Sequence, residues 1–158
     1  MSTKINCLAI DDEPVALEIL ERHISKIDRL NLIKTCTNAT EGFNYLSKHR
    51  IDLIFLDINM PGITGIDFAK AINPQTRIIF TTAYREYAVE GFDLQAVDYL
   101  LKPIALPRLL KAVENYLNLY RKQPKNFKKL VQEANFMFVK IDRKMVKVGF
   151  EDIYLLKA

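Results

Sequence analysis

Residues capable of phosphate chemistry end or directly follow four apolar runs of the chain: Asp11, Asp12 and Glu13, then Asp57, then Thr81 and Thr82, and finally Lys102. Carboxylates that are packed together repel one another unless a cation lies between them. Oxygen ligands of this kind suit Mg²⁺, which keeps several waters and often bridges to phosphate. If the fold brings these side chains together, the set predicts a magnesium-dependent phosphoryl site.

Asp57 is the candidate nucleophile of such a site. A carboxylate oxygen beside the metal could attack a phosphoryl group and form an acyl phosphate. The transferring oxygens then need positive charge and hydrogen-bond donors, which Lys102 and the hydroxyl of Thr82 would supply. Each motif alone has an ordinary structural explanation, since an Asp pair usually caps a helix and Lys-Pro usually forms a turn. Their combination at four strand ends favours the chemical explanation.

Short apolar runs alternate with amphipathic segments over the first 120 residues. The runs predict strands at 5–10, 30–36, 52–57, 77–81 and 97–101, and the segments between them predict helices at 14–26, 38–49, 65–72, 86–94 and 106–120. Asp12 is placed to cap the first helix, and Asn38 with Glu41 has the spacing of a capping box. Five strand–helix pairs indicate an α/β fold with a five-stranded parallel sheet of flavodoxin-like order. Ligands of such sheets bind at the carboxyl ends of the strands.

Composition places the chain among ordinary globular proteins. Its residues are 49% hydrophobic and 27% charged, which argues against disorder. Two cysteines, Cys7 and Cys36, fit small buried side chains in a reducing compartment. The apolar runs are too short to span a bilayer and the N-terminus lacks a signal-peptide core, so we expect a cytoplasmic protein without membrane insertion. The net charge of +4 divides into −2 for residues 1–120 and +6 for residues 121–158.

Residues 4–120 resemble the receiver domain of two-component response regulators. The resemblance rests on four motifs in the family's order: Ile10-Asp11-Asp12-Glu13-Pro14, Leu56-Asp57-Ile58-Asn59-Met60-Pro61-Gly62, Phe80-Thr81-Thr82-Ala83-Tyr84 and Asp98-Tyr99-Leu100-Leu101-Lys102-Pro103. We therefore expect a receiver domain over residues 4–122. The resemblance implies that Asp57 accepts a phosphoryl group from a sensor histidine kinase, and that the domain is a switch rather than an enzyme.

The same resemblance implies roles for the other residues of the site. The implied ligands of Mg²⁺ are Asp11, Asp12, Asp57 and the main-chain carbonyl of Asn59. The implied phosphoryl contacts are the hydroxyl of Thr82, next to Ala83, and the ammonium of Lys102. The ring of Tyr99 would move inward when Thr82 is drawn to the phosphoryl group. Asn59 and Tyr84 match positions that tune dephosphorylation, and Lys102–Pro103 matches the position of a cis peptide bond.

The basic residues 121–158 are expected to differ in structure from the rest. The charged, proline-containing stretch 123–134 predicts a linker. Two alternating runs, at 136–140 and 145–150, flank a turn at 142–144 and predict a hairpin. Residues 135–158 resemble the start of a LytTR-type DNA-binding domain, in the pieces Phe138-Val139-Lys140, Val146-Lys147-Val148 and Asp152-Ile153-Tyr154-Leu155. Because that family's domain is longer, we expect a truncated copy of its N-terminal part, a short β-rich appendage.

These resemblances predict a transcription regulator that is controlled by phosphorylation. Phosphorylated Asp57 would change the face formed by helix 4, strand 5 and helix 5, which would control homodimer formation and DNA binding by a full-length LytTR-type domain. Two alternatives stay open. A haloacid-dehalogenase-like phosphatase needs a second Asp two residues after the nucleophile, where this chain has Asn59. A phosphate-independent interaction module would assemble through the strands of the tail.

Overall fold

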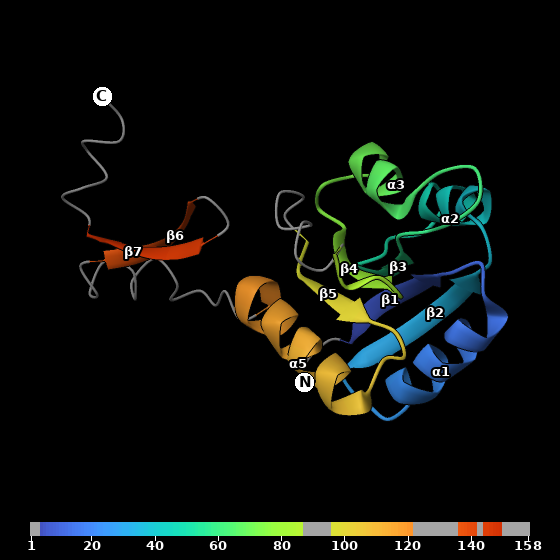
Figure 1. Cartoon of the computed structure of the whole chain (residues 1–158), viewed down its shortest axis with the longest axis horizontal. Helices are drawn as coiled ribbons and strands as arrows, with labels where there is room; N and C mark the ends of the chain where they lie inside the picture. The colour runs from blue at the N-terminus through green and yellow to red at the C-terminus, as the bar shows by residue number, and fades with distance from the viewer. Residues whose placement is uncertain (1–3, 87–95, 122–135, 142–143, 150–158) are drawn as a thin grey trace. The chain divides into compact units, whose positions relative to one another are not determined.

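The first of the chain's two units, residues 1–115, is a parallel sheet covered by helices (Figure 1). The computed structural model describes residues 4–86, 96–121, 136–141 and 144–149. The elements of the first unit are β1 (Ile5–Ile10), α1 (Pro14–Ile24), β2 (Leu30–Cys36), α2 (Ala39–Leu46), β3 (Leu53–Asp57), α3 (Gly65–Ala71), β4 (Arg77–Thr82), β5 (Asp98–Leu101) and α5 (Leu106–Tyr116). Figure 1 shows α1 and α5 on one side of the sheet and α2 and α3 on the other.

The sheet has the strand order β2-β1-β3-β4-β5, and every neighbouring pair is parallel. This order confirms the predicted flavodoxin-like fold. Because all five strands run parallel, their carboxyl ends lie at one edge of the sheet. The predicted helix at 86–94 lies almost entirely outside the described residues, which resume at Ala96.

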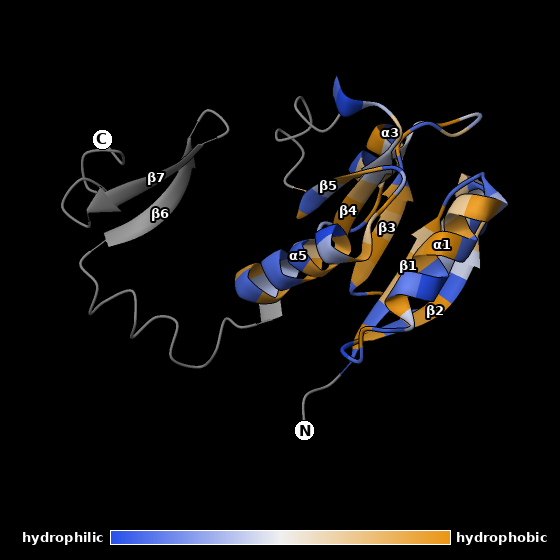
Figure 2. Cartoon of the chain, turned by 60° about the horizontal axis from the view of Figure 1, so that its bottom comes forward, coloured by the Kyte–Doolittle hydropathy of each residue, from blue (hydrophilic) through white to orange (hydrophobic). Residues whose placement is uncertain are grey.

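The core lies on both faces of the central strands. All five residues of β3 are buried, and the apolar runs of β1 and β4 flank it. Figure 2 shows these strands as largely hydrophobic, whereas α1 and α5 carry hydrophobic and hydrophilic residues side by side. Phe68 of α3 is fully buried and stacks on Phe43 of α2, with ring centroids 4.2 Å apart. This packing fixes the strand ends from which the site residues project.

Helix caps differ in part from the prediction. The predicted cap by Asp12 is wrong, because Glu13 occupies the N-cap of α1 and makes no side-chain cap bond. Asp11 accepts the bond from the Glu13 N–H instead, at 2.9 Å. The capping residue Asn38 is confirmed, since its side chain accepts from the N–H of Glu41. Glu41 in turn accepts from the N–H of Thr37 rather than from Asn38 itself.

The second unit, residues 116–158, is described only in part. After α5 the chain forms a π-helical turn, η2 (Leu117–Arg121), where the sequence predicts continued α-helix to residue 120. The predicted hairpin is present as the antiparallel pair β6 (Phe136–Ile141) and β7 (Lys144–Gly149). The predicted linker at 123–134, most of the predicted turn at 142–144 and the motif at 152–155 lie outside the described residues.

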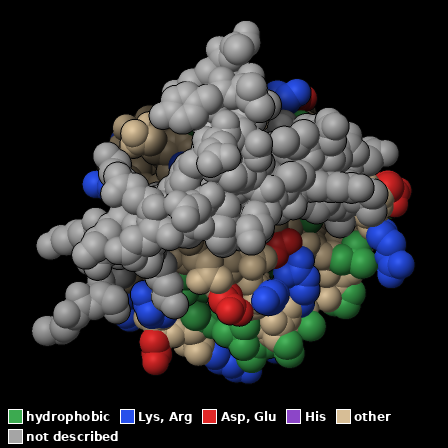
Figure 3. Space-filling model, turned by 90° about the vertical axis from the view of Figure 1, so that its left-hand side faces the viewer, with side chains coloured by type: hydrophobic (Ala, Val, Ile, Leu, Met, Phe, Trp, Pro, Cys, Tyr) green, Lys and Arg blue, Asp and Glu red, His purple; other side chains and the backbone are tan. Residues whose placement is uncertain are grey.

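The described surface carries charges of both signs. On the lower part of the face drawn in Figure 3, acidic and basic side chains lie among hydrophobic ones. Large exposed hydrophobic side chains belong to Val15, Ile33, Tyr84, Leu110 and Leu119. Across the described ranges, no helix is long and apolar enough to cross a membrane.

Candidate functional site

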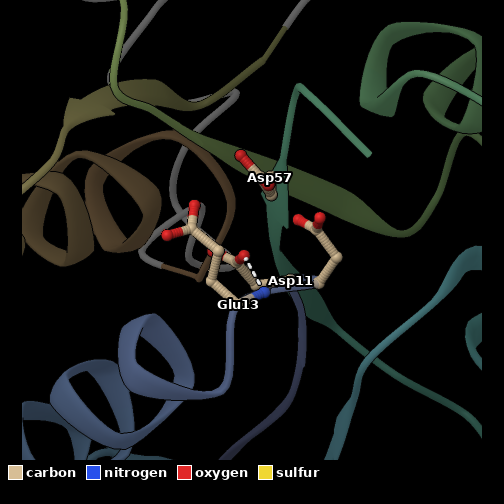
Figure 4. A group of neighbouring side chains, drawn as sticks. Asp11, Glu13 and Asp57 are labelled. Carbon is tan, nitrogen blue, oxygen red and sulfur yellow. Dashed lines mark hydrogen bonds between the residues drawn. The ribbon is translucent and has the colours of Figure 1, made fainter. Parts of the chain in front are cut away.

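Four carboxylates meet at the carboxyl edge of the sheet. Asp11, Asp12 and Glu13 follow β1, and Asp57 ends β3; one oxygen from each lies within 4.8 Å of the others. Figure 4 shows Asp11, Glu13 and Asp57 arranged around a common space. Asp11 and Asp57 are buried, whereas Glu13 is exposed. The sheet therefore brings together the acidic residues that the sequence places at separate strand ends.

Lys102, which follows β5, is the cation of this cluster. Its Nζ lies 2.7 Å from Asp11 Oδ2 and 3.3 Å from both Glu13 Oε1 and Asp57 Oδ1. Burial by itself would lower the pKa of Lys102, but the hydrogen bond to Asp11 and the three negative charges outweigh it and raise the pKa. The side chain thus stays protonated and partly neutralises the acidic site. The Lys102–Pro103 peptide bond is cis.

The pKa of the Asp57 carboxyl group is far above its ordinary value. Burial, followed by the negative charge of Asp11, raises the pKa of Asp57 to about 7. The charge of Lys102 and its hydrogen bond lower that pKa, and the neighbouring side chain of Asp12 raises it further. A single ammonium therefore does not compensate for the packed carboxylates, which leaves the site with excess negative charge.

The donor set fits a hard divalent cation. The side chains of the cluster offer carboxylate oxygens, and these are the ligands that Mg²⁺ takes in proteins. Asp12 Oδ1 is buried and has no hydrogen-bond partner among the described residues. A buried carboxylate oxygen without a partner is costly unless a cation or water satisfies it. Asp11, Asp12 and Asp57 are thus the residues that could hold such an ion.

Thr82 lies at the end of β4, beside the acidic strands. It is fully buried, and its Oγ accepts a hydrogen bond from the N–H of Tyr84 at 3.0 Å. Accepting this bond leaves the hydroxyl proton available for donation to another group. Three exposed residues lie just beyond the strand ends: Ala83 and Tyr84 follow β4, and Asn59 lies two residues after the end of β3. Their exposure leaves room for a bound group, and the roles expected of these three residues stay predictions.

The ring of Tyr99 is buried in this structure. Tyr99 lies in β5 and stacks on Phe80 of β4, with ring centroids 5.2 Å apart. In the β4–β5 register these two residues are partners, and Thr82 pairs with Leu101 two residues further on. The predicted aromatic switch residue is therefore packed against the strand that carries the predicted hydroxyl.

Two contacts at the site were not predicted from the sequence. A Cβ at Gly65, the first residue of α3, would overlap the main-chain carbonyl oxygen of Asp57. Only glycine lets α3 begin so close to the acidic strand end. Likewise, Glu13 contacts Lys102 although the prediction assigned it no role of its own. The acidic run Asp11-Asp12-Glu13 is the only sequence signal for that contact.

Comparison with known proteins agrees with this geometry. The sequence profile of the response regulator receiver domain matches residues 7–114. The chain therefore belongs to the response regulator receiver family. Response regulator receiver domains with transcription-regulator relatives are signalling domains rather than enzymes, and this agrees with the expectation that the domain is not an enzyme.

Individual relatives match the same part of the chain. An uncharacterized response regulatory protein of Shewanella oneidensis is 42% identical over 112 residues, covering 70% of this chain and 48% of that protein. The transcriptional regulatory protein BtsR of Escherichia coli K12 is 41% identical over 111 residues, covering 69% and 46%. This chain spans about half the length of these curated relatives.

A solved structure shares the fold as well. The isolated receiver domain of RcsB from Salmonella enterica serovar Typhimurium, in the presence of the phosphomimetic BeF₃⁻, superimposes with a TM-score of 0.69. It is 25% identical, and the match covers 81% of this chain and 99% of that one.

Proposed function

We propose that this protein is a phosphorylation-controlled switch in which Asp57 accepts a phosphoryl group from a phosphohistidine of a sensor histidine kinase. The observation that carries this proposal is the buried Asp57 in contact with Lys102 and within 4.8 Å of two further aspartates. In the transfer, the N–P bond of the phosphohistidine breaks and an O–P bond to Asp57 forms. The imidazole leaves and takes up a proton.

The residues around Asp57 have distinct parts in this step. Asp11, Asp12, Asp57 and the carbonyl of Asn59 would hold Mg²⁺, which supplies positive charge for the phosphoryl oxygens. Lys102, already 3.3 Å from Asp57, would turn from Asp11 and Glu13 to the new phosphoryl group. Thr82, with its available hydroxyl proton, would donate to a phosphoryl oxygen and draw the Tyr84 peptide with it.

An opening beside Lys102 gives the donor protein a place to dock. A cavity of about 330 Å³ is lined by Glu13, Val15, Ala16, Ile19, Ala83, Lys102, Pro103 and Ile104. It is mostly apolar, and Val15 on α1 is 66% exposed. A partner that delivers phosphate to Asp57 must approach past Lys102, so we assign this surface to the helix that carries the phosphohistidine.

The output is proposed to be DNA binding and transcription control. Residues 123–134 would link the receiver, residues 4–122, to a LytTR-type domain that begins in residues 135–158. The antiparallel β6–β7 hairpin and the +6 charge of residues 121–158 support a DNA-binding output, and the similarity over 111 residues to BtsR, a transcriptional regulatory protein, supports transcription control. Tyr99 and Thr82 would report phosphorylation to the β5–α5 side and favour a homodimer. Sedimentation with and without acetyl phosphate tests the dimer.

The experiment that tests phosphoryl acceptance is intact mass after incubation with acetyl phosphate, with Mg²⁺ or with EDTA. We expect one added phosphoryl group in the wild type, only with Mg²⁺, and none in Asp57→Asn. Asp67→Asn is the matched control, because Asp67 lies exposed on α3. Labelling of Asp57→Asn, or labelling that persists in EDTA, would contradict the proposal. A wild type that takes up no phosphoryl group would favour the phosphate-independent interaction module instead.

A further inference from the structure

Asp98, the first residue of β5, is the centre of a hydrogen-bonded cluster on α5 and β5. Arg108 binds both of its carboxylate oxygens, with Nη1 2.9 Å from Oδ2 and Nη2 2.6 Å from Oδ1. Asn115 Nδ2 donates to Oδ2 at 3.0 Å, and the N–H of Tyr99 donates to Oδ1 at 2.8 Å. We call Asp98, Arg108 and Asn115 the Asp98 clamp.

The clamp holds the main chain at Tyr99 from both sides of the residue. Its carboxylate accepts from the Tyr99 N–H, and Arg108 Nη2 also donates to the Tyr99 carbonyl at 3.2 Å. In the five-stranded sheet β5 is an edge strand, with β4 as its neighbour on one side. In an interior strand, such peptide groups would pair with a second neighbouring strand. Here side chains of α5 and β5 bind the N–H and the carbonyl of Tyr99 instead.

The geometry of the clamp distinguishes it from an ordinary surface ion pair. A two-pronged guanidinium–carboxylate contact fixes direction as well as distance. The Asp98 side chain is 15% exposed and the Arg108 side chain 44%. The hydrogen bond to Asp98 also raises the pKa of Arg108. By contrast, Lys111 and Glu114 on the same helix approach only to 3.9 Å and are both largely exposed, so their pairing adds little.

We propose that Asp98, Arg108 and Asn115 are positioning residues that join helix α5 to the main chain at Tyr99, so that the two move as one unit. The clamp acts on the peptide groups, whereas Phe80 packs against the ring of the same residue. Any shift of the Tyr99 backbone must then either carry α5 along or break the fork to Arg108. This inference deepens the proposed switch and rests on it for the second of the two tests below.

The first test needs no phosphoryl group. Amide hydrogen exchange at Tyr99 is compared in the full chain between wild type, Arg108→Gln and the matched control Lys111→Gln. Normalised to the amide of Phe55 in central strand β3, exchange at Tyr99 should be at least 10-fold faster in Arg108→Gln and unchanged in Lys111→Gln. Arg108→Lys keeps the charge but not the fork, so it should fall between them.

Equal Tyr99 exchange in Arg108→Gln and Lys111→Gln would overturn the proposal. If Arg108→Gln does not fold, Asn115→Ala, which removes a single hydrogen bond, gives the same comparison.

The second test follows the NMR methyl signals of Leu109, which is fully buried on α5, on addition of acetyl phosphate and Mg²⁺.

In the second test we expect the Leu109 signals to shift in the wild type and at least five-fold less in Arg108→Gln, with Asp57 labelled equally in both. An equal shift in both proteins, or no shift in a fully labelled wild type, would overturn the coupling. Absence of labelling in the wild type would refute the proposed function instead, and the exchange test would still decide the clamp by itself.

Discussion

Replacing Asp57 by Asn should stabilise the metal-free fold at alkaline pH, although it removes the predicted acceptor. The reason is the packed charge: burial and then Asp11 raise the pKa of Asp57 from its ordinary value of 3.8 to about 7. A pKa difference of one between the folded and unfolded states corresponds to about 1.4 kcal/mol, so this rise sets a ceiling of about 4 kcal/mol. Relaxation and water access reduce such values, and we expect about 2 kcal/mol.

The pH dependence follows from the direction of this change. Because the pKa of the Asp57 carboxyl is raised on folding, the folded protein holds the proton more tightly than the unfolded chain does. The cost of ionised Asp57 is therefore absent below about pH 4, grows as the pH rises and is complete above about pH 7. At pH 5 about a third of it should be present.

Urea unfolding in EDTA at pH 5 and pH 8 measures the effect. Asp57→Asn should gain about 2 kcal/mol over wild type at pH 8 and clearly less at pH 5. Asp67→Asn, at an exposed site, should gain nothing at either pH. Millimolar Mg²⁺ should shrink the gain, because binding to the wild-type carboxylates stabilises the folded state. A loss of stability in Asp57→Asn at pH 8, or a gain independent of pH, would refute the electrostatic reasoning.

Two further substitutions test the surroundings of the site. Gly65→Ala places a methyl group against the Asp57 carbonyl oxygen, so it should destabilise the fold by about 1–3 kcal/mol in urea unfolding and slow labelling by acetyl phosphate. Gly62→Ala, at a φ of +87° in open space, should cost about 1 kcal/mol and leave the labelling rate unchanged; equal rates in the two variants would contradict the close approach. Val15→Ser should slow phosphotransfer from a phosphorylated histidine-kinase dimerisation domain at least 10-fold, while acetyl phosphate labels it as fast as wild type. Ile33→Ser, at an exposed position on β2, should change neither rate. If Val15→Ser slowed labelling by acetyl phosphate as much as phosphotransfer from the kinase domain, the docking assignment would be wrong.

The fold was predictable because burial on both faces of a parallel strand leaves a continuous apolar run. β3, with all five of its residues buried, is the clearest example. Such runs, separated by helical spacing, restrict the topology to very few choices. The positions of Asp57 and Lys102 then followed, since a residue directly after a strand in this topology must lie at one edge of the sheet. Helix ends were less predictable, as the α1 cap at Glu13 instead of Asp12 shows.

The contacts that sequence reasoning missed depend on distance in space rather than on local pattern. Arg108 meets Asp98 across ten residues and two elements, and the sequence around either residue carries no sign of the other. Gly65 looks like an ordinary loop glycine until α3 is packed on the sheet and its neighbour proves to be the Asp57 carbonyl. To predict such contacts one must know the register of the strands and where each helix packs on the sheet, and a single sequence does not give either.

The closure of β5 by its own helix also bears on how this sheet could join another chain. Edge strands are where sheets of separate molecules fuse, and a strand whose outward peptide groups are already bound is a poor template for such growth. With Tyr99 held by Asp98 and Arg108, the other margin of the sheet, β2, offers the better template. There the exposed Ile33 is followed by the exposed Lys34, a charge of the type that natural sheets place at an edge against unwanted stacking. Replacing Lys34 is therefore the most direct way to engineer a continuous sheet from two molecules. Joining the sheets along β5 instead would first require breaking the Asp98 clamp.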